Sequence, residues 1–221
     1  MRCTSMIFIF LMLVLFQYMQ GQSKEYTILF IGDSYTVGES VAAELSYPSQ
    51  LVSALKKQGI NIKSHKIVAK TGWTTGELME ALLADEDYNK YDFVFLCIGV
   101  NNQYRGLDLN IFKKELVTLI NYSIMFSGNK PDNITVLSIP DYGYTPFGEV
   151  KQAQISTEID VYNGIVHETA KKSGVNFVEI TSISRNKDLT LVADDRLHPS
   201  AKQYLLWVEK LLQHLLPKIT K

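Results

Sequence analysis

The sequence predicts an α/β protein with a five-stranded parallel sheet covered by helices on both faces, a three-layer α/β/α sandwich. Two observations predict this class. Short apolar runs recur along the chain, as is typical of strands buried on both faces of a parallel sheet. Longer stretches between them carry apolar residues at helical spacing, and right-handed crossovers place such helices on both sides of the sheet.

Each predicted element has local evidence. The apolar runs predict strands over 26–31, 61–69, 93–98, 134–139 and 176–180. The helical spacing predicts helices over 47–58, 75–84, 109–126, 155–173 and 199–216. Glycines end the first and fourth helices, and Thr74 or Thr75 caps the second. Pro199 suits the first turn of the last helix, and Pro217 follows its end.

The composition is that of an ordinary globular protein. The 46% hydrophobic and 20% charged residues exclude disordered and fibrous classes. A chain of 221 residues is long enough for one domain with a closed core. The formal net charge is -1, and there is no basic tract, which argues against a nucleic-acid partner and a polybasic membrane anchor.

The N-terminal segment has the order of a secretory signal peptide. Arg2 precedes an apolar run over 6–16, and a polar zone follows. The run is shorter than a membrane span of about 20 residues. We therefore expect a cleaved signal peptide over 1–22, a single domain over 23–221, and a secreted or periplasmic product without a membrane span. An uncleaved N-terminal anchor stays open, because the cleavage zone is not a clean A-x-A.

A candidate nucleophile follows the first strand, where sites of parallel sheets lie, at the carboxyl ends of strands. Gly32 permits a tight turn that exposes the hydroxyl of Ser34. A serine hydroxyl is a weak nucleophile and needs an adjacent base. The alternative is that Asp33 or Ser34 only caps the next helix.

A candidate base lies near the other end of the chain. Asp195 precedes His198 by three residues, so its carboxylate can hold one imidazole nitrogen while the other faces the serine. Asp194 is the second choice for this role. Pro199 begins the last helix and leaves His198 on the loop before it. A solvated acidic loop with a helix-capping histidine is the alternative.

Other nucleophile and base candidates are weaker. Cys97 lies in an apolar run and is expected to be a buried core residue. His65 lies in a predicted strand, and His167 and His214 lie in helical patterns, where surface or core-edge positions are expected.

Two further strand ends offer hydrogen-bond donors for an oxyanion. Gly72 follows the second strand and can present its backbone N–H. Asn101 follows the third strand and can present its side-chain amide. Glycine and asparagine are also common in turns, so a structural role in a turn explains either segment when it is considered alone.

Taken together, these segments resemble the GDSL esterase/lipase family, also called SGNH hydrolases. The resemblance rests on Gly-Asp-Ser, Gly72, Gly-x-Asn and Asp-x-x-His-Pro in this order, from the first strand to the last helix. It implies the flavodoxin-like SGNH fold, with Ser34 as nucleophile, His198 as base and Asp195 orienting it. It also implies an oxyanion hole of Ser34, Gly72 and Asn101, and no metal or organic cofactor.

Two positions depart from the family pattern. Tyr35 replaces the leucine of Gly-Asp-Ser-Leu, and Asn102 replaces the aspartate of Gly-x-Asn-Asp. Neither carries a direct chemical role, although Asn102 affects how the loop bearing Asn101 is held. The serine is not in a G-x-S-x-G elbow, which disfavours the α/β-hydrolase superfamily.

Aromatic residues near the predicted site suggest a substrate-binding surface. The candidates are Trp73, Tyr104, Tyr142 and Tyr144. Three roles stay open for them, which are stacking on sugars, lining an acyl pocket and packing the loops. We expect a serine esterase that deacylates, for example deacetylates, glycans or small esters. The alternatives are a lysophospholipase or thioesterase, a non-catalytic carbohydrate-binding relative, and acyl transfer to a sugar acceptor.

Overall fold

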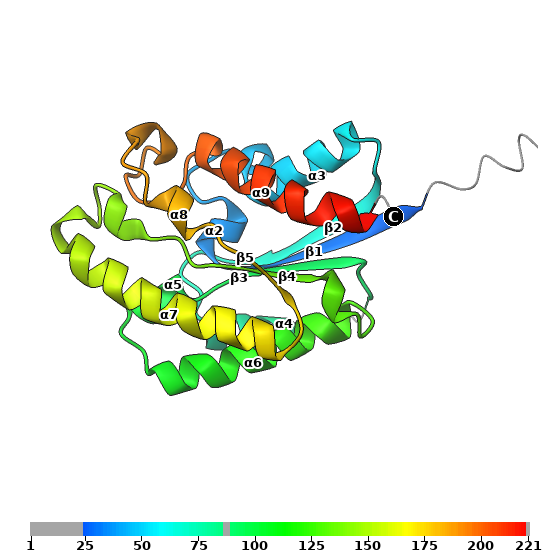
Figure 1. Ribbon diagram of the computed structural model, residues 1–221, viewed down its shortest axis with the longest axis horizontal. Helices are drawn as coiled ribbons and strands as arrows, with labels where there is room; N and C mark the ends of the chain where they lie inside the picture. The colour runs from blue at the N-terminus through cyan, green and yellow to red at the C-terminus, as the bar shows by residue number, and fades with distance from the viewer. Residues whose placement is uncertain (1–23, 86–88, 220–221) are drawn as a thin grey trace, which may run out of the picture.

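The computed structural model describes residues 24–85 and 89–219, and these form one sheet with helices on both faces (Figure 1). The five strands pair in the order β2-β1-β3-β4-β5, and every pairing is parallel. This is the flavodoxin-like order, in which the chain first winds one way from β1 and then the other. The predicted three-layer fold is confirmed.

The strands match the predicted runs closely. They are β1 (Glu25–Gly32), β2 (Asn61–Ala69), β3 (Phe93–Cys97), β4 (Ile134–Leu137) and β5 (Asn176–Val178). Every residue of β3 and β4 is buried, as expected for central strands. The edge strand β2 is largely exposed and carries His65 there. Cys97 is buried at the end of β3, as predicted.

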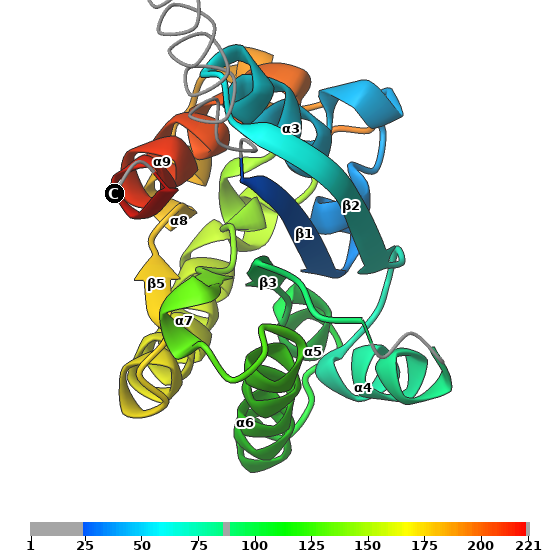
Figure 2. The ribbon, with the colours of Figure 1, turned by 90° about the vertical axis from the view of Figure 1, so that its right-hand side faces the viewer.

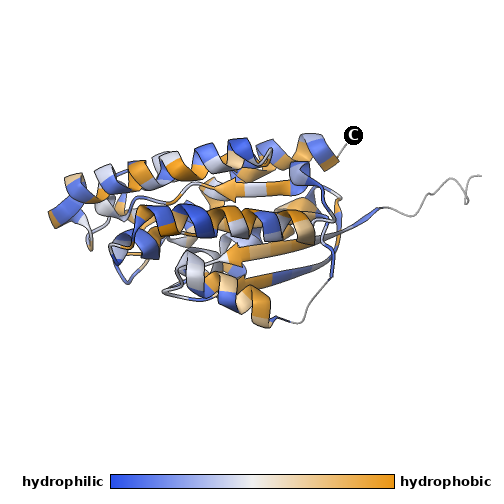
Figure 3. Cartoon of the chain, turned by 90° about the horizontal axis from the view of Figure 1, so that it is seen from below, coloured by the Kyte–Doolittle hydropathy of each residue, from blue (hydrophilic) through white to orange (hydrophobic). Residues whose placement is uncertain are grey.

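The long helices form the two outer layers. On one face α3 (Tyr47–Lys57) packs against α9 (Ala201–Ile219). On the other face α6 (Leu109–Phe126) packs between α4 (Thr75–Ala84) and α7 (Gln152–Lys172). Figures 1 and 2 show these groups on opposite sides of the sheet. In Figure 3 the strands are mostly hydrophobic and the helices carry both kinds of residue, as helices with one face on a core do.

Short elements connect the long ones, and the sequence did not predict them. Three are helices: α2 (Ser34–Val37), α5 (Val100–Tyr104) and α8 (Thr181–Ser184). Five are 3₁₀ turns: η1 (Ala43–Leu45), η2 (Pro131–Asn133), η3 (Tyr142–Tyr144), η4 (Glu149–Lys151) and η5 (Leu189–Leu191). Both α2 and α5 directly follow a strand, so they occupy the edge of the sheet at which the site was predicted.

Both prolines of the last helix were placed wrongly. Pro199 forms an isolated β-bridge with Val192, so the helix begins two residues later, and Ser200 accepts a hydrogen bond from the backbone N–H of Gln203. Pro217 lies inside the helix, not after it. In this last turn Lys218 donates to the backbone carbonyl of Asp132 at 3.1 Å.

The predicted signal peptide over 1–22 lies outside the described residues. Within 24–85 and 89–219, no helix combines the length and hydrophobicity that crossing a membrane requires.

Burial of α9 against the sheet predicts a stability difference within one helix. Leu211 is fully buried, so Leu211→Ala should lower the free energy of unfolding by about 2–5 kcal/mol. Leu205 on the same helix is 48% exposed, so Leu205→Ala should cost under about 1 kcal/mol. Urea denaturation of both variants measures the difference. Equal losses would contradict the described packing of α9.

Candidate active site

Ser34 is held where β1 turns into α2. The side chain of Asp33 caps this short helix by accepting a hydrogen bond from the backbone N–H of Tyr35 at 3.0 Å. A Cβ atom on Gly32 would lie 2.2 Å from both the carbonyl oxygen of Cys97 and the hydroxyl of Thr36, so only glycine fits there. Ser34 is the first residue of α2, and first-turn N–H groups have no partner within the helix.

Asp33 is fully buried directly beneath this turn. Burial raises the pKa of its carboxyl to about 7, although backbone hydrogen bonds, including the one from Tyr35, oppose the rise. Its second oxygen, Oδ2, has no hydrogen-bond partner among the described residues. Asp33 is therefore a capping residue whose ionised form is disfavoured by burial.

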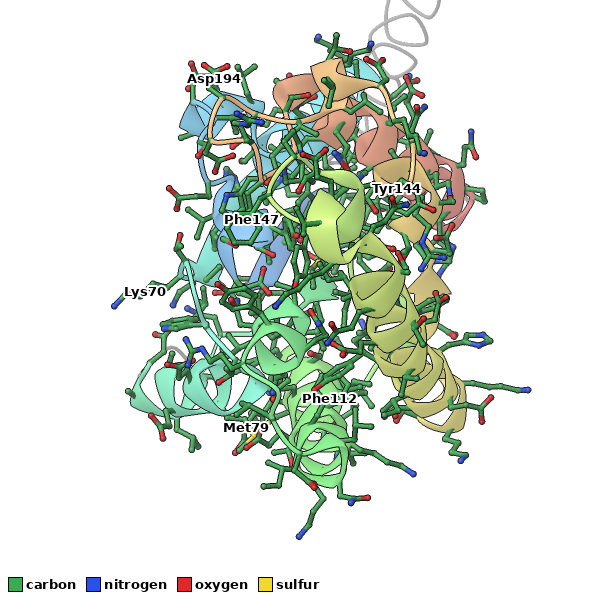
Figure 4. All side chains as sticks on the ribbon, turned by 90° about the vertical axis from the view of Figure 1, so that its left-hand side faces the viewer. Lys70, Met79, Phe112, Tyr144, Phe147 and Asp194 are labelled. Atoms are coloured by element: carbon green, nitrogen blue, oxygen red, sulfur yellow. The ribbon has the colours of Figure 1, made fainter. Side chains whose placement is uncertain are left out.

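His198 and Asp195 lie on a tight loop before α9. The N–H of Ala193 donates to the carbonyl of His198 at 2.8 Å and closes this loop. The Asp195 oxygen Oδ2 lies 2.5 Å from His198 Nδ1, and Oδ1 accepts the backbone N–H groups of Leu197 and His198. Asp194 is exposed at the edge of the molecule (Figure 4). The structure thus brings Asp195, and not Asp194, to the histidine.

A fourth hydrogen-bond donor to Asp195 has no signal in the sequence. Ser40, on the loop after α2, donates its hydroxyl to Asp195 Oδ2 at 2.6 Å. Its backbone has a φ of 66°, in the left-handed region that few non-glycine residues adopt. Burial opposes ionisation of Asp195, but the hydrogen bonds from Ser40, His198 and the backbone hold the pKa of Asp195 well below its usual range. No sequence pattern pairs Ser40 with a residue 155 positions away.

The two residues predicted to donate to the oxyanion, Gly72 and Asn101, lie on segments that follow β2 and β3. Hydrogen bonds join these two segments. Asn101, on α5, donates its side-chain amide to the carbonyl of Trp73 at 2.9 Å. Arg105 donates to the carbonyl of Gly72 at 2.5 Å. Gly72 has a φ of 87°, a conformation that favours glycine. Thr71 donates its hydroxyl to Glu39, which joins this loop to the segment after α2.

The family departure Asn102 has a structural role. Its side chain is fully buried, and Oδ1 accepts the backbone N–H of Thr75 at 3.0 Å. Its Nδ2 donates to the Thr75 hydroxyl at 2.7 Å, and that hydroxyl donates to Glu115. Asn102 therefore holds the loop that bears Asn101 against the start of α4.

These residues meet at one open cleft of about 190 Å³. Its lining includes all the predicted reactive residues except Asp195, which reaches it through His198. The full lining is Ser34, Tyr35, Thr71, Gly72, Val100, Asn101, Tyr104, Tyr142, Phe147, Leu197 and His198. Tyr35 packs its ring edge-on against the His198 ring, with centroids 5.8 Å apart, so this departure supports the imidazole.

The aromatic candidates divide into two groups. Tyr104 and Tyr142 line the cleft, together with Phe147, which the prediction missed although it lies in the same aromatic segment. Trp73 and Tyr144 do not line it. In Figure 4 Phe147 and Tyr144 project from different sides of their loop.

No cluster of His, Cys, Asp and Glu suited to a metal ion occurs in 24–85 and 89–219. The residues that line the cleft offer a hydroxyl, an imidazole and N–H donors. That set can carry out nucleophilic and acid–base chemistry without a metal.

A serine, a carboxylate-paired imidazole and N–H donors at the carboxyl edge of a parallel sheet are typical of hydrolases that act on esters. The sequence comparison agrees with this class. The chain belongs to the GDSL-like lipase/acylhydrolase family, whose model matches residues 30–206. It is therefore a hydrolase that acts on ester bonds, as the motifs predicted.

Solved structures share the fold. The psychrotrophic esterase EstA from Pseudoalteromonas sp. superposes with a TM-score of 0.65 at 18% identity, covering 89% of this chain and 100% of its own. The acetylxylan esterase Axe2 from Geobacillus stearothermophilus has a TM-score of 0.63 at 21% identity, covering 86% and 94%. LAE5, from the metagenome of Lake Arreo in Spain, has a TM-score of 0.67 at 18% identity, covering 86% and 94%. No curated protein matches the sequence.

The buried carboxyl of Asp33 predicts a pH-dependent stability. Its pKa is about 7 in the folded state against 3.8 when exposed, so the folded state binds its proton more tightly. Stability should therefore fall as pH rises from about 4 to 7 and then level off. Asp33→Asn, which cannot ionise, should gain stability over the natural chain across this window.

Urea denaturation at several pH values between 4 and 8 measures this effect. Asp194→Asn is the matched control, because Asp194 is exposed. A stability difference between Asp33→Asn and the natural chain that stays constant with pH would contradict the prediction.

Proposed function

We propose that this chain is a secreted serine esterase that removes short acyl groups by way of an acyl-enzyme on Ser34. The observation that carries the proposal is the shared cleft. Ser34 and His198 both line this cleft, and the Nδ1 atom of His198 is hydrogen-bonded to Asp195. The nitrogen left to act on the serine proton is Nε2.

In the proposed reaction, Ser34 Oγ attacks the acyl carbonyl while His198 Nε2 takes the hydroxyl proton. The tetrahedral intermediate collapses, the bond to the alcohol oxygen breaks, and His198 returns the proton to the leaving alkoxide. Water then attacks the acyl-enzyme, with His198 again as base, and releases the carboxylic acid and free Ser34. Asp195 holds the Nδ1–H of the imidazole and stabilises its charged form.

The oxyanion would be bound by three donors. Two are backbone N–H groups, of Ser34 at the start of α2 and of Gly72. The third is the amide of Asn101, which has two N–H bonds and uses one for the carbonyl of Trp73. The ties between Gly72, Trp73 and α5 support this assignment, because preorganised donors need no rearrangement when charge develops.

A small acyl group on a carbohydrate alcohol is the substrate that we favour. The cleft of about 190 Å³ is small and open, and the rings of Tyr104, Tyr142 and Phe147 line it beside Ser34 and His198. Axe2 is an acetylxylan esterase, and a serine-to-alanine form of it is described as a catalytic mutant. EstA is described as inhibited by monoethylphosphonate. Likeness to Axe2 supports deacetylation as the first activity to test.

Export is part of the proposal. The expected signal peptide ends at residue 22, and β1 begins at Glu25. Removal of residues 1–22 would therefore leave the whole sheet intact.

Replacing the nucleophile tests the proposed function. The mature chain should release p-nitrophenol from p-nitrophenyl acetate, and Ser34→Ala should reduce kcat by at least about 1000-fold. A fluorophosphonate probe should label the natural chain and not the variant. Equal turnover in both folded proteins would refute Ser34 as nucleophile, and no labelling of either would favour a binding protein.

The contact from Ser40 predicts a role in positioning Asp195. Loss of its hydroxyl removes one hydrogen bond of about 1 kcal/mol, so kcat should fall roughly 3- to 10-fold. The carboxylate would also act more strongly on the imidazole, so the acid limb of the kcat/KM profile should move to higher pH. Both effects are measured with Ser40→Ala.

Ser40→Gly separates the hydroxyl from the backbone. Glycine relaxes the left-handed φ of 66° but also lacks the hydroxyl, so its activity should fall like that of Ser40→Ala. If Ser40→Gly keeps full activity and an unshifted pH profile, Ser40 does not position Asp195.

A further inference from the structure

A second cavity, the side pocket, opens beside the cleft and measures about 420 Å³. The two cavities share three aromatic residues, Tyr104, Tyr142 and Phe147. The ring centroids of each pair lie 6.2 Å apart. Tyr104 is 60% exposed and Phe147 is 51% exposed, so their rings are open to a ligand that spans both cavities.

The rest of the side pocket combines polar side chains with Val150 and Ile155, and its polar groups come mainly from the start of α7. Gln154 and Glu158 lie one turn apart on this helix, and Lys151 directly precedes it. Glu158 Oε2 accepts a hydrogen bond from Gln103 Nε2 at 2.6 Å, and Oε1 accepts one from Gln154 Nε2 at 2.9 Å. These amide donors lower the pKa of Glu158 from its ordinary value, so the side pocket holds a fixed, ionised acceptor.

The carboxylate, the amide groups and the aromatic rings together favour a ligand that carries both hydroxyl groups and an apolar face. An ionised carboxylate has about four acceptor positions, and the two amides use two of those on Glu158. Hydroxyl groups of a ligand can use the others, while Lys151 and Gln154 offer donors. A long acyl chain would instead remove Glu158 and Lys151 from water without replacing their hydrogen bonds, which is costly. A sugar ring supplies both hydroxyls for this wall and an apolar face for the aromatic rings.

We propose that the side pocket is a binding subsite for a saccharide unit, so that the preferred ester is a short acyl group on an oligosaccharide. The acyl group would occupy the cleft at Ser34, and a neighbouring sugar unit would lie across Tyr104 and Phe147 toward Glu158. This inference rests on the proposed ester hydrolysis, which it extends by assigning a binding place to a second sugar unit of the alcohol.

Substrate comparison gives the first test. Acetate release is measured with acetylated cellobiose and xylobiose, with acetylated glucose and xylose, and with p-nitrophenyl acetate. A disaccharide acetate should exceed its monosaccharide acetate at least tenfold in kcat/KM, mainly through a lower KM. Equal values for the two lengths with both sugars would overturn the subsite.

Variants of the polar wall give the second test. Glu158→Ala and Gln154→Ala should raise KM for the disaccharide acetate about five- to tenfold, with a much smaller effect on p-nitrophenyl acetate. Gln154 is exposed, so its variant remains informative if Glu158→Ala folds poorly. Glu168→Ala, on the same helix but outside the side pocket, is the matched control and should leave both activities unchanged. Loss of both activities in parallel, or of neither, would overturn the proposal.

Direct binding separates this inference from the proposed function. Ser34→Ala protein should bind the disaccharide acetate, as measured by calorimetry, and the added change Glu158→Ala should weaken binding about tenfold. If Ser34→Ala still turns over p-nitrophenyl acetate, the mechanism fails, whereas the substrate comparison and the variants of the polar wall still test the subsite. If Ser34 proves essential but Glu158→Ala leaves binding unchanged, only the subsite fails.

Discussion

The carboxylate of Asp195 is the contact on which the geometry of the site depends. One of its oxygens meets His198 Nδ1 and the Ser40 hydroxyl, and the other accepts two backbone N–H groups of its own loop. All four contacts favour the ionised form and together outweigh the cost of partial burial. Because Ser40 follows the helix that begins with Ser34, this carboxylate joins the segment that bears the proposed nucleophile to the histidine loop.

A separate hydrogen-bonded network holds the other side of the cleft. Arg105 fixes the carbonyl of Gly72, Asn101 fixes that of Trp73, and Asn102 attaches the same short helix to the start of α4. These hydrogen bonds join the segments that follow β2 and β3, two strands that are separated by β1 in the sheet. Short strand-to-helix connections supply the residues, and side-chain hydrogen bonds supply the rigidity that the proposed oxyanion site needs.

Polarity distinguishes the two cavities of the site region. The cleft is small and lined mainly by rings and reactive groups, whereas the larger side pocket ends in Glu158 and its amide donors. The shared aromatic residues Tyr104, Tyr142 and Phe147 form the boundary. A ligand that extends past this boundary must satisfy a fixed carboxylate, which an acyl chain cannot do and a sugar hydroxyl can.

The sequence by itself determined the fold class, the five strands and the order of the motifs, because apolar periodicity and strand-end residues are local signals. It did not place Pro199, Pro217 or the short helices, whose ends depend on neighbouring segments. It favoured Asp195 over Asp194 as the partner of His198 but kept Asp194 as the second choice. Only the tertiary structure brought Ser40 to Asp195 and Glu158 beside the aromatic rim, because contacts between residues far apart in sequence leave no periodic pattern in the chain.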